Sequence, residues 1–251
     1  MPRIRALKSY SHEGLNASSP AARRTVLLAT EEMSQAQYPL EISDEVPDFT
    51  LDSQMGSIDF HDLIDGKWCL LVTFSSAFDP VATTDIGALC KMSSEFEARN
   101  IVVVTMGNDT IANYRRWSKD IEELQAVKVS LPLMCDNNCT QLKKFGCARD
   151  FPLEGGKSKP TCLGAFLIDI DRRIRVATKY SLMTGRNFYE FLRVFDALNL
   201  AIHHKCLVPS NWASGQEVML SADMTKDEAA LFRYSEIKPW FRVMPDPLSL
   251  T

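Results

Sequence analysis

Short apolar runs alternate with amphipathic segments through the middle of the chain, and this alternation limits the fold more than any other sequence feature. The runs at 69–74 and 101–106 are mostly apolar and contain no glycine or proline, which is typical of buried strands. The segments that follow them, 83–99 and 110–123, carry apolar residues at helical spacing. Strands that alternate with helices in this way predict an α/β fold with a mixed central sheet flanked by helices.

Weaker signals extend this pattern toward the C-terminus. We expect a short strand at 131–134, a short helix near 138–146 and two further strands at 165–168 and 174–177. Asn187 and Glu190 have the spacing of a capping box, which predicts a helix that begins at Phe188. Prolines punctuate the residues after 205, so we expect an α/β domain at 45–204 and a small C-terminal subdomain at 205–251.

Composition and charge exclude several classes of protein. The 251 residues are 45% hydrophobic and 24% charged, as in ordinary globular proteins, and the net charge of −4 gives no overall attraction to nucleic acid. The apolar runs are too short for a transmembrane helix, and the N-terminus lacks the apolar stretch of a secretory signal. Because seven cysteines is an odd number, we expect reduced thiols and a cytoplasmic location.

Residues 1–44 are rich in serine, alanine and charge and show little apolar periodicity. Two interpretations remain open: a disordered tail, or a basic arm that is extended or bound to a protein partner. The second assigns partner binding to five cationic side chains, which an acidic surface would attract. They are Arg3, Arg5, Lys8, Arg23 and Arg24. An acidic cytoskeletal polymer such as tubulin is one such surface and would place the chain in a cytoskeletal or axonemal assembly.

Several motifs occur in a fixed order between Val46 and Pro247. Val46-Pro47-Asp48-Phe49 opens the series, and Phe78-Asp79-Pro80-Val81-Ala82 lies between an expected strand and an expected helix. Later motifs are Thr184-Gly185-Arg186-Asn187-Phe188, Pro209-x-x-Trp212-x-x-Gly215 and Arg242-Val243-x-Pro245. Together these segments resemble the peroxiredoxins, in particular the one-cysteine subfamily of the peroxiredoxin-6 type. The resemblance implies a thioredoxin-like fold with a C-terminal subdomain, thiol-dependent peroxidase as the family activity, and a homodimer.

The chain departs from the family's active-site pattern, which is Pro-x-x-x-Thr/Ser-x-x-Cys. Pro80 and Val81 are retained, but Ala82 stands at the position of the peroxide-reducing cysteine and Asp79 at the Thr/Ser position. The subfamily's histidine aligns with Phe74 and its arginine with Leu163. Peroxide reduction needs a thiolate and groups that stabilise charge as the O–O bond breaks. The resemblance therefore implies a degenerate peroxidase site that uses no cofactor and no metal.

The subfamily's proposed acyl-hydrolase site is degenerate as well. His61 and Asp171 fall at its histidine and aspartate positions, whereas Lys67 stands in place of the serine. Without the hydroxyl, no acyl-enzyme can form. We therefore interpret His61 as a partly buried structural histidine.

The other cysteines show neither a zinc-binding pattern nor the setting of a reactive thiol. Cys69, Cys90 and Cys162 fit structural thiols in or beside buried elements, and Cys135, Cys139 and Cys147 lack the paired spacing of zinc ligands.

Three hypotheses for the function remain open. The first hypothesis is an inactive peroxiredoxin-like protein that serves as a structural or interaction module. The second is an antioxidant peroxidase that uses a displaced cysteine such as Cys90 or Cys162. The third is a regulatory partner that pairs with an active peroxiredoxin.

Overall fold

The computed structural model describes residues 38–151 and 156–250. Except for Tyr38, these residues belong to one compact unit, residues 39–251. The five cationic residues assigned to partner binding, Arg3, Arg5, Lys8, Arg23 and Arg24, lie outside the described residues.

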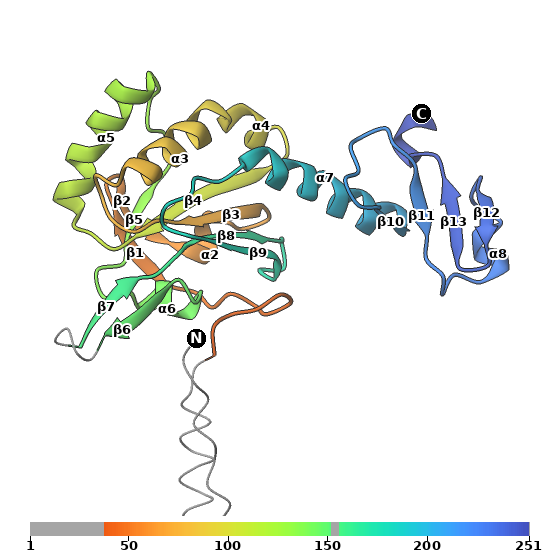
Figure 1. The fold of residues 1–251 in the computed structure, drawn as a ribbon, viewed down its shortest axis with the longest axis horizontal. Coiled ribbons are helices and arrows are strands. Elements are labelled where there is room, and N and C mark those ends of the chain that lie inside the picture. The colour runs from red at the N-terminus through yellow and green to blue at the C-terminus, as the bar shows by residue number, and fades with distance from the viewer. Residues whose placement is uncertain (1–37, 152–155, 251) are drawn as a thin grey trace, which may run out of the picture. The chain divides into compact units, whose positions relative to one another are not determined.

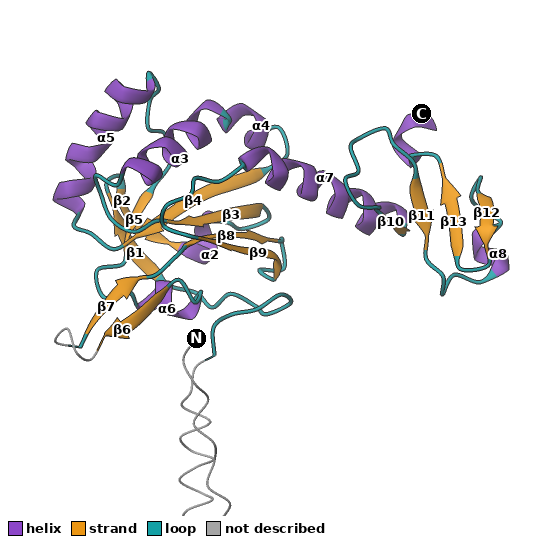
Figure 2. Cartoon of the chain, in the orientation of Figure 1, coloured by secondary structure: helices purple, strands orange, loops and turns teal. Residues whose placement is uncertain are grey.

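A seven-stranded mixed sheet forms the centre of this unit, as the sequence predicts (Figures 1 and 2). Its strand order is β2-β1-β5-β4-β3-β8-β9. Neighbours β3, β4 and β5 pair in parallel, whereas the other neighbouring pairs are antiparallel. The strands are β1 (Thr50–Ser53), β2 (Gly56–Asp59), β3 (Trp68–Thr73), β4 (Ile101–Gly107), β5 (Leu133–Cys135), β8 (Leu163–Ile168) and β9 (Ile174–Tyr180).

Helices cover both faces of the sheet. In Figure 1, α3, α4 and α5 lie on one face, and α6 lies on the other beside the β6–β7 hairpin. The helices are α2 (Phe60–Leu63), α3 (Pro80–Lys91), α4 (Ser93–Glu97), α5 (Ile111–Gln125), α6 (Thr140–Lys144) and α7 (Phe188–His204), and the hairpin strands are β6 (Ala148–Phe151) and β7 (Lys157–Pro160). The single helix expected at 83–99 is wrong, because the chain leaves helical geometry at Met92 and forms two helices, α3 and α4.

Strand β3 separates two hydrophobic clusters because its side chains alternate between the faces of the sheet. Leu70 and Val72 pack in the cluster that includes residues of α3, α5 and α7. Cys69 and Leu71 pack on the opposite face with residues of α2 and α6. All six β3 residues are buried, which explains why this run is apolar throughout instead of alternating with exposed polar residues.

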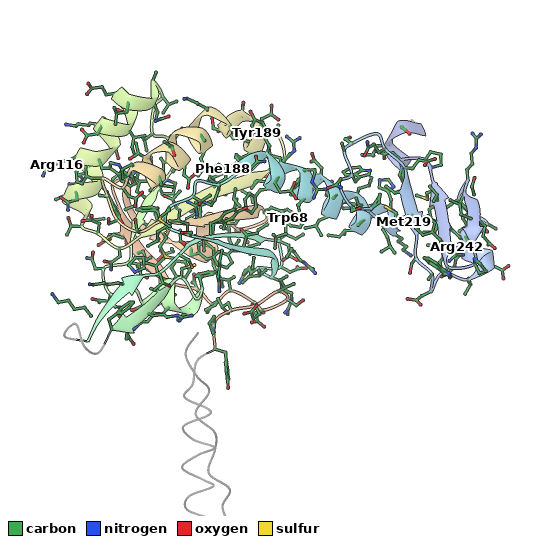
Figure 3. The ribbon with its side chains drawn as sticks, viewed as in Figure 1. Trp68, Arg116, Phe188, Tyr189, Met219 and Arg242 are labelled. Atoms are coloured by element: carbon green, nitrogen blue, oxygen red, sulfur yellow. The ribbon has the colours of Figure 1, made fainter. Side chains whose placement is uncertain are left out.

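Helix α7 begins where the capping signal predicts, but only half of the capping box forms. The Tyr189 backbone N–H donates to the Asn187 Oδ1 at 3.1 Å. The Glu190 carboxylate instead accepts two hydrogen bonds from the Arg193 guanidinium, each 2.7 Å long. Along the same helix, Phe195 packs edge-on against Trp68 of β3, with ring centroids 5.1 Å apart. Figure 3 labels Trp68 on β3 and Phe188 at the start of α7.

The C-terminal residues form a second, four-stranded antiparallel sheet in the order β10-β11-β13-β12. Its strands are β10 (Cys206–Leu207), β11 (Val218–Leu220), β12 (Ser235–Lys238) and β13 (Phe241–Met244), with α8 (Lys226–Ala229) and a 3-10 turn at Pro247–Leu250. Trp212, Val218, Leu220 and Met244 pack there against Leu200 near the end of α7. A separate hydrophobic cluster therefore exists where the sequence predicts a small subdomain. None of the helices in the described residues is long and apolar enough to cross a bilayer.

Candidate functional site

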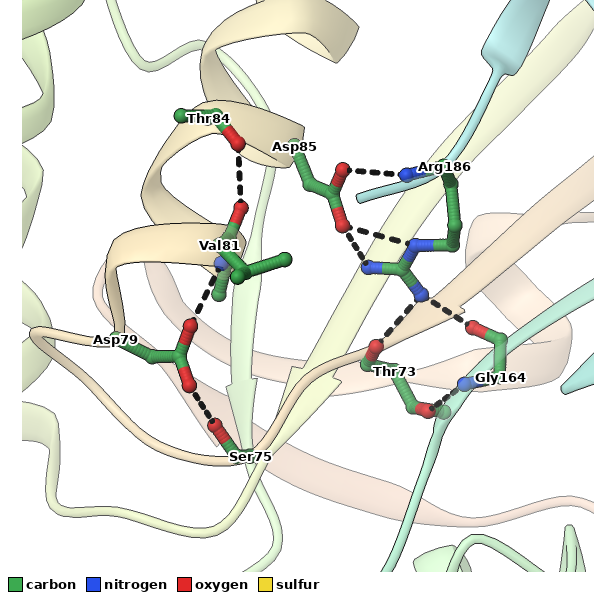
Figure 4. A network of polar contacts seen from close by, with 9 residues as sticks. Thr73, Ser75, Asp79, Val81, Thr84, Asp85, Gly164 and Arg186 are labelled. Carbon is green, nitrogen blue, oxygen red and sulfur yellow. Dashed lines mark hydrogen bonds and ion pairs between the residues drawn. The ribbon is translucent and has the colours of Figure 1, made fainter. Parts of the chain in front are cut away.

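The loop between β3 and α3 carries the residues that align with the peroxidase site. Its last residue, Asp79, is the N-cap of α3, and Pro80 is the first helical residue. The Ala82 backbone N–H donates to Asp79 Oδ1 at 2.9 Å (Figure 4). The Thr83 hydroxyl donates to the Asp79 carbonyl at 2.7 Å. A helix N-terminus attracts anions because its first N–H groups lack partners within the helix. In this chain the carboxylate of Asp79 already binds there.

A second change in the loop accompanies Asp79, and the sequence reasoning missed it. The family pattern places its first proline seven residues before the cysteine position, which is residue 75 in this chain. Ser75 stands there, and its hydroxyl donates to the other oxygen of the Asp79 carboxylate at 2.7 Å (Figure 4). Pro80 does not fill this position, because it begins α3. The two substituted residues therefore bind each other, and together they tie the loop to the start of the helix.

Ala82 itself is part of the core. Its side chain is completely buried and packs in the cluster between the sheet and helices α3, α5 and α7. The next residue, Thr83, accepts a 2.9 Å hydrogen bond from the Trp117 indole N–H of α5. The side chain that the sequence analysis aligns with the family's nucleophile is therefore a methyl group packed in the core, without a thiol, hydroxyl or amine.

Phe74, at the family's histidine position, belongs to an aromatic group. Its ring centroid lies 5.6 Å from that of Tyr114 and 5.3 Å from that of Trp117, both on α5. The ring also covers Gly107 at the end of β4, where a Cβ atom would overlap it. Phe74 is almost fully buried, so its surroundings are apolar and would leave a polar side chain at this position without hydration.

A buried arginine does lie near the start of α3, but the backbone and a carboxylate use its donors. The Arg186 Nε and Nη2 atoms bind Asp85 Oδ2 at 2.9 and 2.8 Å, and its Nη1 donates to the Thr73 and Gly164 carbonyls at 2.7 and 2.6 Å (Figure 4). Burial lowers the pKa of Arg186, while the charge of Asp85 opposes that shift. Leu163, at the family's arginine position, is fully buried and apolar.

The Arg186–Asp85 pair went unrecognised in the sequence because its members are 101 residues apart. The motif Thr184-Gly185-Arg186-Asn187-Phe188 marks the resemblance to the family, but nothing in it indicates a partner for Arg186. Asp85 also accepts from the Arg186 backbone N–H at 3.0 Å, so the pair connects α3 to the segment before α7.

The residues aligned with the hydrolase site do not assemble. The His61 Nε2 lies 2.8 Å from the Val46 carbonyl, and its Nδ1 lies 3.1 Å from an Arg172 guanidinium nitrogen. Both ring nitrogens therefore have partners within the fold. Lys67 and Asp171 are exposed, and among the hydrogen bonds and ion pairs of the described residues none joins His61, Lys67 and Asp171 to one another. These contacts support a structural role for His61.

The cysteines differ from the expectation at two positions. Cys69, Cys135, Cys139, Cys147 and Cys206 are buried, but Cys90 and Cys162 are only partly buried, and all seven are free thiols. In residues 38–151 and 156–250, no three His, Cys, Asp or Glu side chains converge as metal ligands do. Burial raises the pKa of the Cys90 thiol, whereas the pKa of the Cys162 thiol is lowered to about 6, chiefly because it accepts a hydrogen bond from the Cys147 side chain.

The thioredoxin-like sheet, the loop before α3 and the buried Arg186 together define a protein of the peroxiredoxin class. Residues 42–177 match the AhpC/TSA family. The chain is 32% identical to a 1-Cys peroxiredoxin of Dictyostelium discoideum, over 83% of this chain and 86% of that protein. It is 30% identical to Peroxiredoxin-6 of Gallus gallus, over 76% and 87% of the two chains.

Solved structures give the same result. A cysteine-to-serine mutant of the Peroxiredoxin 6 of Arenicola marina superposes with a TM-score of 0.75 and 28% identity, over 83% of this chain and 99% of that chain. The yeast mitochondrial 1-Cys peroxiredoxin has a TM-score of 0.74 and 29% identity, over 82% and 99%. The chain therefore belongs to the AhpC/TSA family of thiol peroxidases, and within that family it is peroxiredoxin-6-like.

Proposed function

We propose that this chain is a catalytically inactive peroxiredoxin-6-like protein that serves as a structural or interaction module. The observation that carries the proposal is the state of the helix α3 N-terminus. Ala82 stands at the nucleophile position, and the backbone N–H that would stabilise a thiolate there binds the Asp79 carboxylate at 2.9 Å.

The surrounding residues support the same conclusion. Phe74 and Leu163 are buried and apolar where the family places a histidine and an arginine. The Arg186 side chain is only 1% exposed, and four of its five N–H donors already bind Asp85 and two carbonyls. Nothing in this constellation binds the peroxide or stabilises the leaving oxygen.

Turnover of hydrogen peroxide with dithiothreitol tests the proposal. A Cys162→Ser variant, which lacks the partly exposed thiol with the lowered pKa, should consume peroxide no faster than dithiothreitol mixed with an equal concentration of a cysteine peptide. Peroxiredoxin-6 of Gallus gallus provides the positive control. Faster turnover by this variant would overturn the proposal, because it would show a peroxidase site that does not depend on Cys162.

Restoring the nucleophile gives a sharper version of this test. In Ala82→Cys, the Asp79 carboxylate would lie close to the new sulfur. Two unit charges about 4 Å apart at an effective dielectric constant of about 20 interact by roughly 4 kcal/mol, which corresponds to a thiol pKa about 3 units higher. Ala82→Cys alone should therefore stay inactive, and the double variant Ala82→Cys/Asp79→Thr should show a lower thiol pKa. Full peroxidase activity in the single variant would contradict the assigned role of Asp79.

For the module's partner, the proposal includes residues 1–44 as a basic arm that binds an acidic protein surface, attached to the 45–204 domain and the 205–251 subdomain. The composition of the arm supports this part, since residues 1–30 contain only one acidic residue beside five cationic ones. The cationic residues are Arg3, Arg5, Lys8, Arg23 and Arg24. We propose a cytoplasmic location in a cytoskeletal or axonemal assembly and a homodimer through the family interface. Detergent and moderate-salt fractionation should leave the full chain in the cytoskeletal pellet and release a chain that lacks residues 1–44. Equal release of both forms would refute the arm's role.

A further inference from the structure

Two cysteines that the family's chemistry does not use lie side by side at the edge of the β6–β7 hairpin. Strands β6 and β7 are antiparallel, with Ala148 opposite Pro160. The pairing continues one residue further, because the Thr161 backbone N–H donates to the Cys147 carbonyl at 2.8 Å. The Cys162 thiol then lies 3.8 Å from the Gly146 carbonyl. Cys147 and Cys162 therefore occupy adjacent positions on two antiparallel segments.

This arrangement is compatible with a disulfide. The register places Cys147 opposite Thr161, so Cys162 is one residue further along the neighbouring segment. Strands lie about 4.8 Å apart and rise about 3.4 Å per residue, which puts the Cα atoms of two such residues about 6 Å apart, and a disulfide needs a Cα separation below about 7 Å. Cys147 is held from one side by a 2.7 Å bond from its backbone N–H to the Leu142 carbonyl. On the other side its sulfur approaches Gly164, where a Cβ atom would lie only 2.5 Å from it. The lack of a side chain at Gly164 leaves the Cys147 sulfur its space.

The two thiols have different electrostatic environments. The pKa of Cys162 is lowered to about 6, first by the hydrogen bond from the Cys147 side chain, and further by the charges of Lys179 and Arg149 and by the Thr161 hydroxyl, while burial acts in the opposite direction. Cys147 is fully buried and its pKa is raised, because its proton is held between the two sulfurs and because burial disfavours its thiolate. Cys162 is therefore the more acidic thiol of the pair.

We propose that Cys147 and Cys162 form a redox site in which a hydroperoxide converts the two thiols into an intramolecular disulfide. Cys162 is the partly exposed thiolate that attacks, and Cys147 is the buried thiol that resolves. Cys147 and Cys162 follow Ala82 by 65 and 80 residues along the chain, and their chemistry does not require the loop before α3. It gives the module a stoichiometric response to oxidant that is separate from peroxidase turnover.

The chemistry balances in two steps. The Cys162 thiolate attacks the hydroxyl-bearing oxygen of the hydroperoxide, an S–O bond forms, the O–O bond breaks, and the departing alkoxide or hydroxide takes a proton from water. Cys162 is then a sulfenic acid. The Cys147 sulfur attacks the Cys162 sulfur, the S–S bond forms, and the hydroxide that leaves combines with the Cys147 proton to give water. Two thiols are oxidised by two electrons, and one hydroperoxide is reduced to an alcohol or water.

The first experiment treats the reduced full chain with one equivalent of hydrogen peroxide and without any thiol reductant. The intact mass should fall by two hydrogen atoms, and tryptic digestion should give residues 145–149 linked to residues 158–172, since these peptides contain Cys147 and Cys162. The link should be absent in Cys162→Ser and unchanged in Cys90→Ser, the matched control at the other partly exposed thiol. Absence of the link in the wild-type chain, or its persistence in Cys162→Ser, would overturn the proposal.

A second variant separates attack from resolution. Cys147→Ala retains the attacking thiol and should accumulate a Cys162 sulfenic acid that dimedone traps. Cys162→Ser changes only a partly exposed side chain, so it remains a usable test if Cys147→Ala does not fold, which circular dichroism would show. Dimedone modification of Cys90 instead of Cys162 in folded Cys147→Ala would refute the assignment.

Alkylation of the reduced protein with iodoacetamide adds a readout of pH. Cys162 should react with a midpoint near pH 6, losing about tenfold in rate per unit below it as the thiolate becomes protonated. At pH 7 it should react faster than Cys90, because the pKa of Cys162 is lowered whereas burial raises that of Cys90. Faster labelling of Cys90 would contradict the proposal. None of these three experiments measures catalytic turnover. A negative result here would therefore refute the Cys147–Cys162 site without bearing on whether the protein is an inactive peroxiredoxin.

Discussion

Replacing Asp85 by asparagine should weaken the whole fold, because this substitution leaves a buried guanidinium without its counter-charge. The Arg186 and Asp85 side chains are only 1% and 4% exposed. Asp85 accepts from the Arg186 Nε at 2.9 Å, from its Nη2 at 2.8 Å and from its backbone N–H at 3.0 Å. An asparagine could retain part of this hydrogen bonding but none of the negative charge.

The size of the effect follows from the burial of the pair. Removing one partner of a buried ion pair costs about 3–5 kcal/mol, since the remaining charge is left uncompensated. For a chain of this size each kcal/mol corresponds to about 2–4 °C in the melting temperature. We therefore expect Asp85→Asn to lower the melting temperature by about 10 °C, with the same sheet content in circular dichroism before the transition.

The matched control is the partly exposed pair between Arg99 and Asp196. These side chains are 26% and 32% exposed, and the Arg99 Nε lies 2.9 Å from Asp196 Oδ1. Solvent screens such a pair, so Asp196→Asn should cost about 1 kcal/mol or less. Urea unfolding followed by circular dichroism measures both variants. If Asp85→Asn costs no more than Asp196→Asn, the argument that burial sets the magnitude is refuted.

Two further substitutions test the packing of the degenerate site by the same unfolding measurement. Asp79→Ala should cost about 1 kcal/mol because α3 loses its N-cap, whereas Asp79→Asn should retain most of that stability; equal losses would argue against capping. Gly107→Ala should cost about 1–3 kcal/mol because the new methyl group overlaps the Phe74 ring, and Phe74→Leu in the same chain should recover part of it. A neutral Gly107→Ala would show that the ring moves freely.

The sequence predicts the central strands well because burial on both faces of the sheet makes them nearly continuous apolar runs. The run at 69–74 corresponds to β3, and the run at 101–106 corresponds to β4. The strands of the C-terminal sheet were not predicted, since β12 is exposed at every position and shows no alternation. The β6–β7 hairpin was missed for a similar reason, because its strands are short and largely polar.

The substituted positions of the candidate site could be identified from the spacing of one loop, but the interactions among them could not. The alignment places Asp79 and Ala82, yet only the structure shows that Asp79 binds the Ala82 N–H and Ser75 together. Likewise, no local pattern connects Arg186 to a carboxylate 101 residues away. Hydrogen bonds between distant segments depend on the completed fold, which sequence periodicity does not encode.

The packing of Phe74 has a consequence for the evolution of this chain. Its ring fills space against Tyr114 and Trp117, and removing a buried phenyl ring costs about 3–5 kcal/mol, a large share of the roughly 5–15 kcal/mol that stabilises a native protein. A polar residue at position 74 would therefore lower stability before it could contribute to any activity. A cysteine at position 82 alone would place a thiol beside the Asp79 carboxylate. On the proposed function, single substitutions at these positions should thus cost stability or fail to activate the thiol, so a peroxidase site could arise here only through several simultaneous changes.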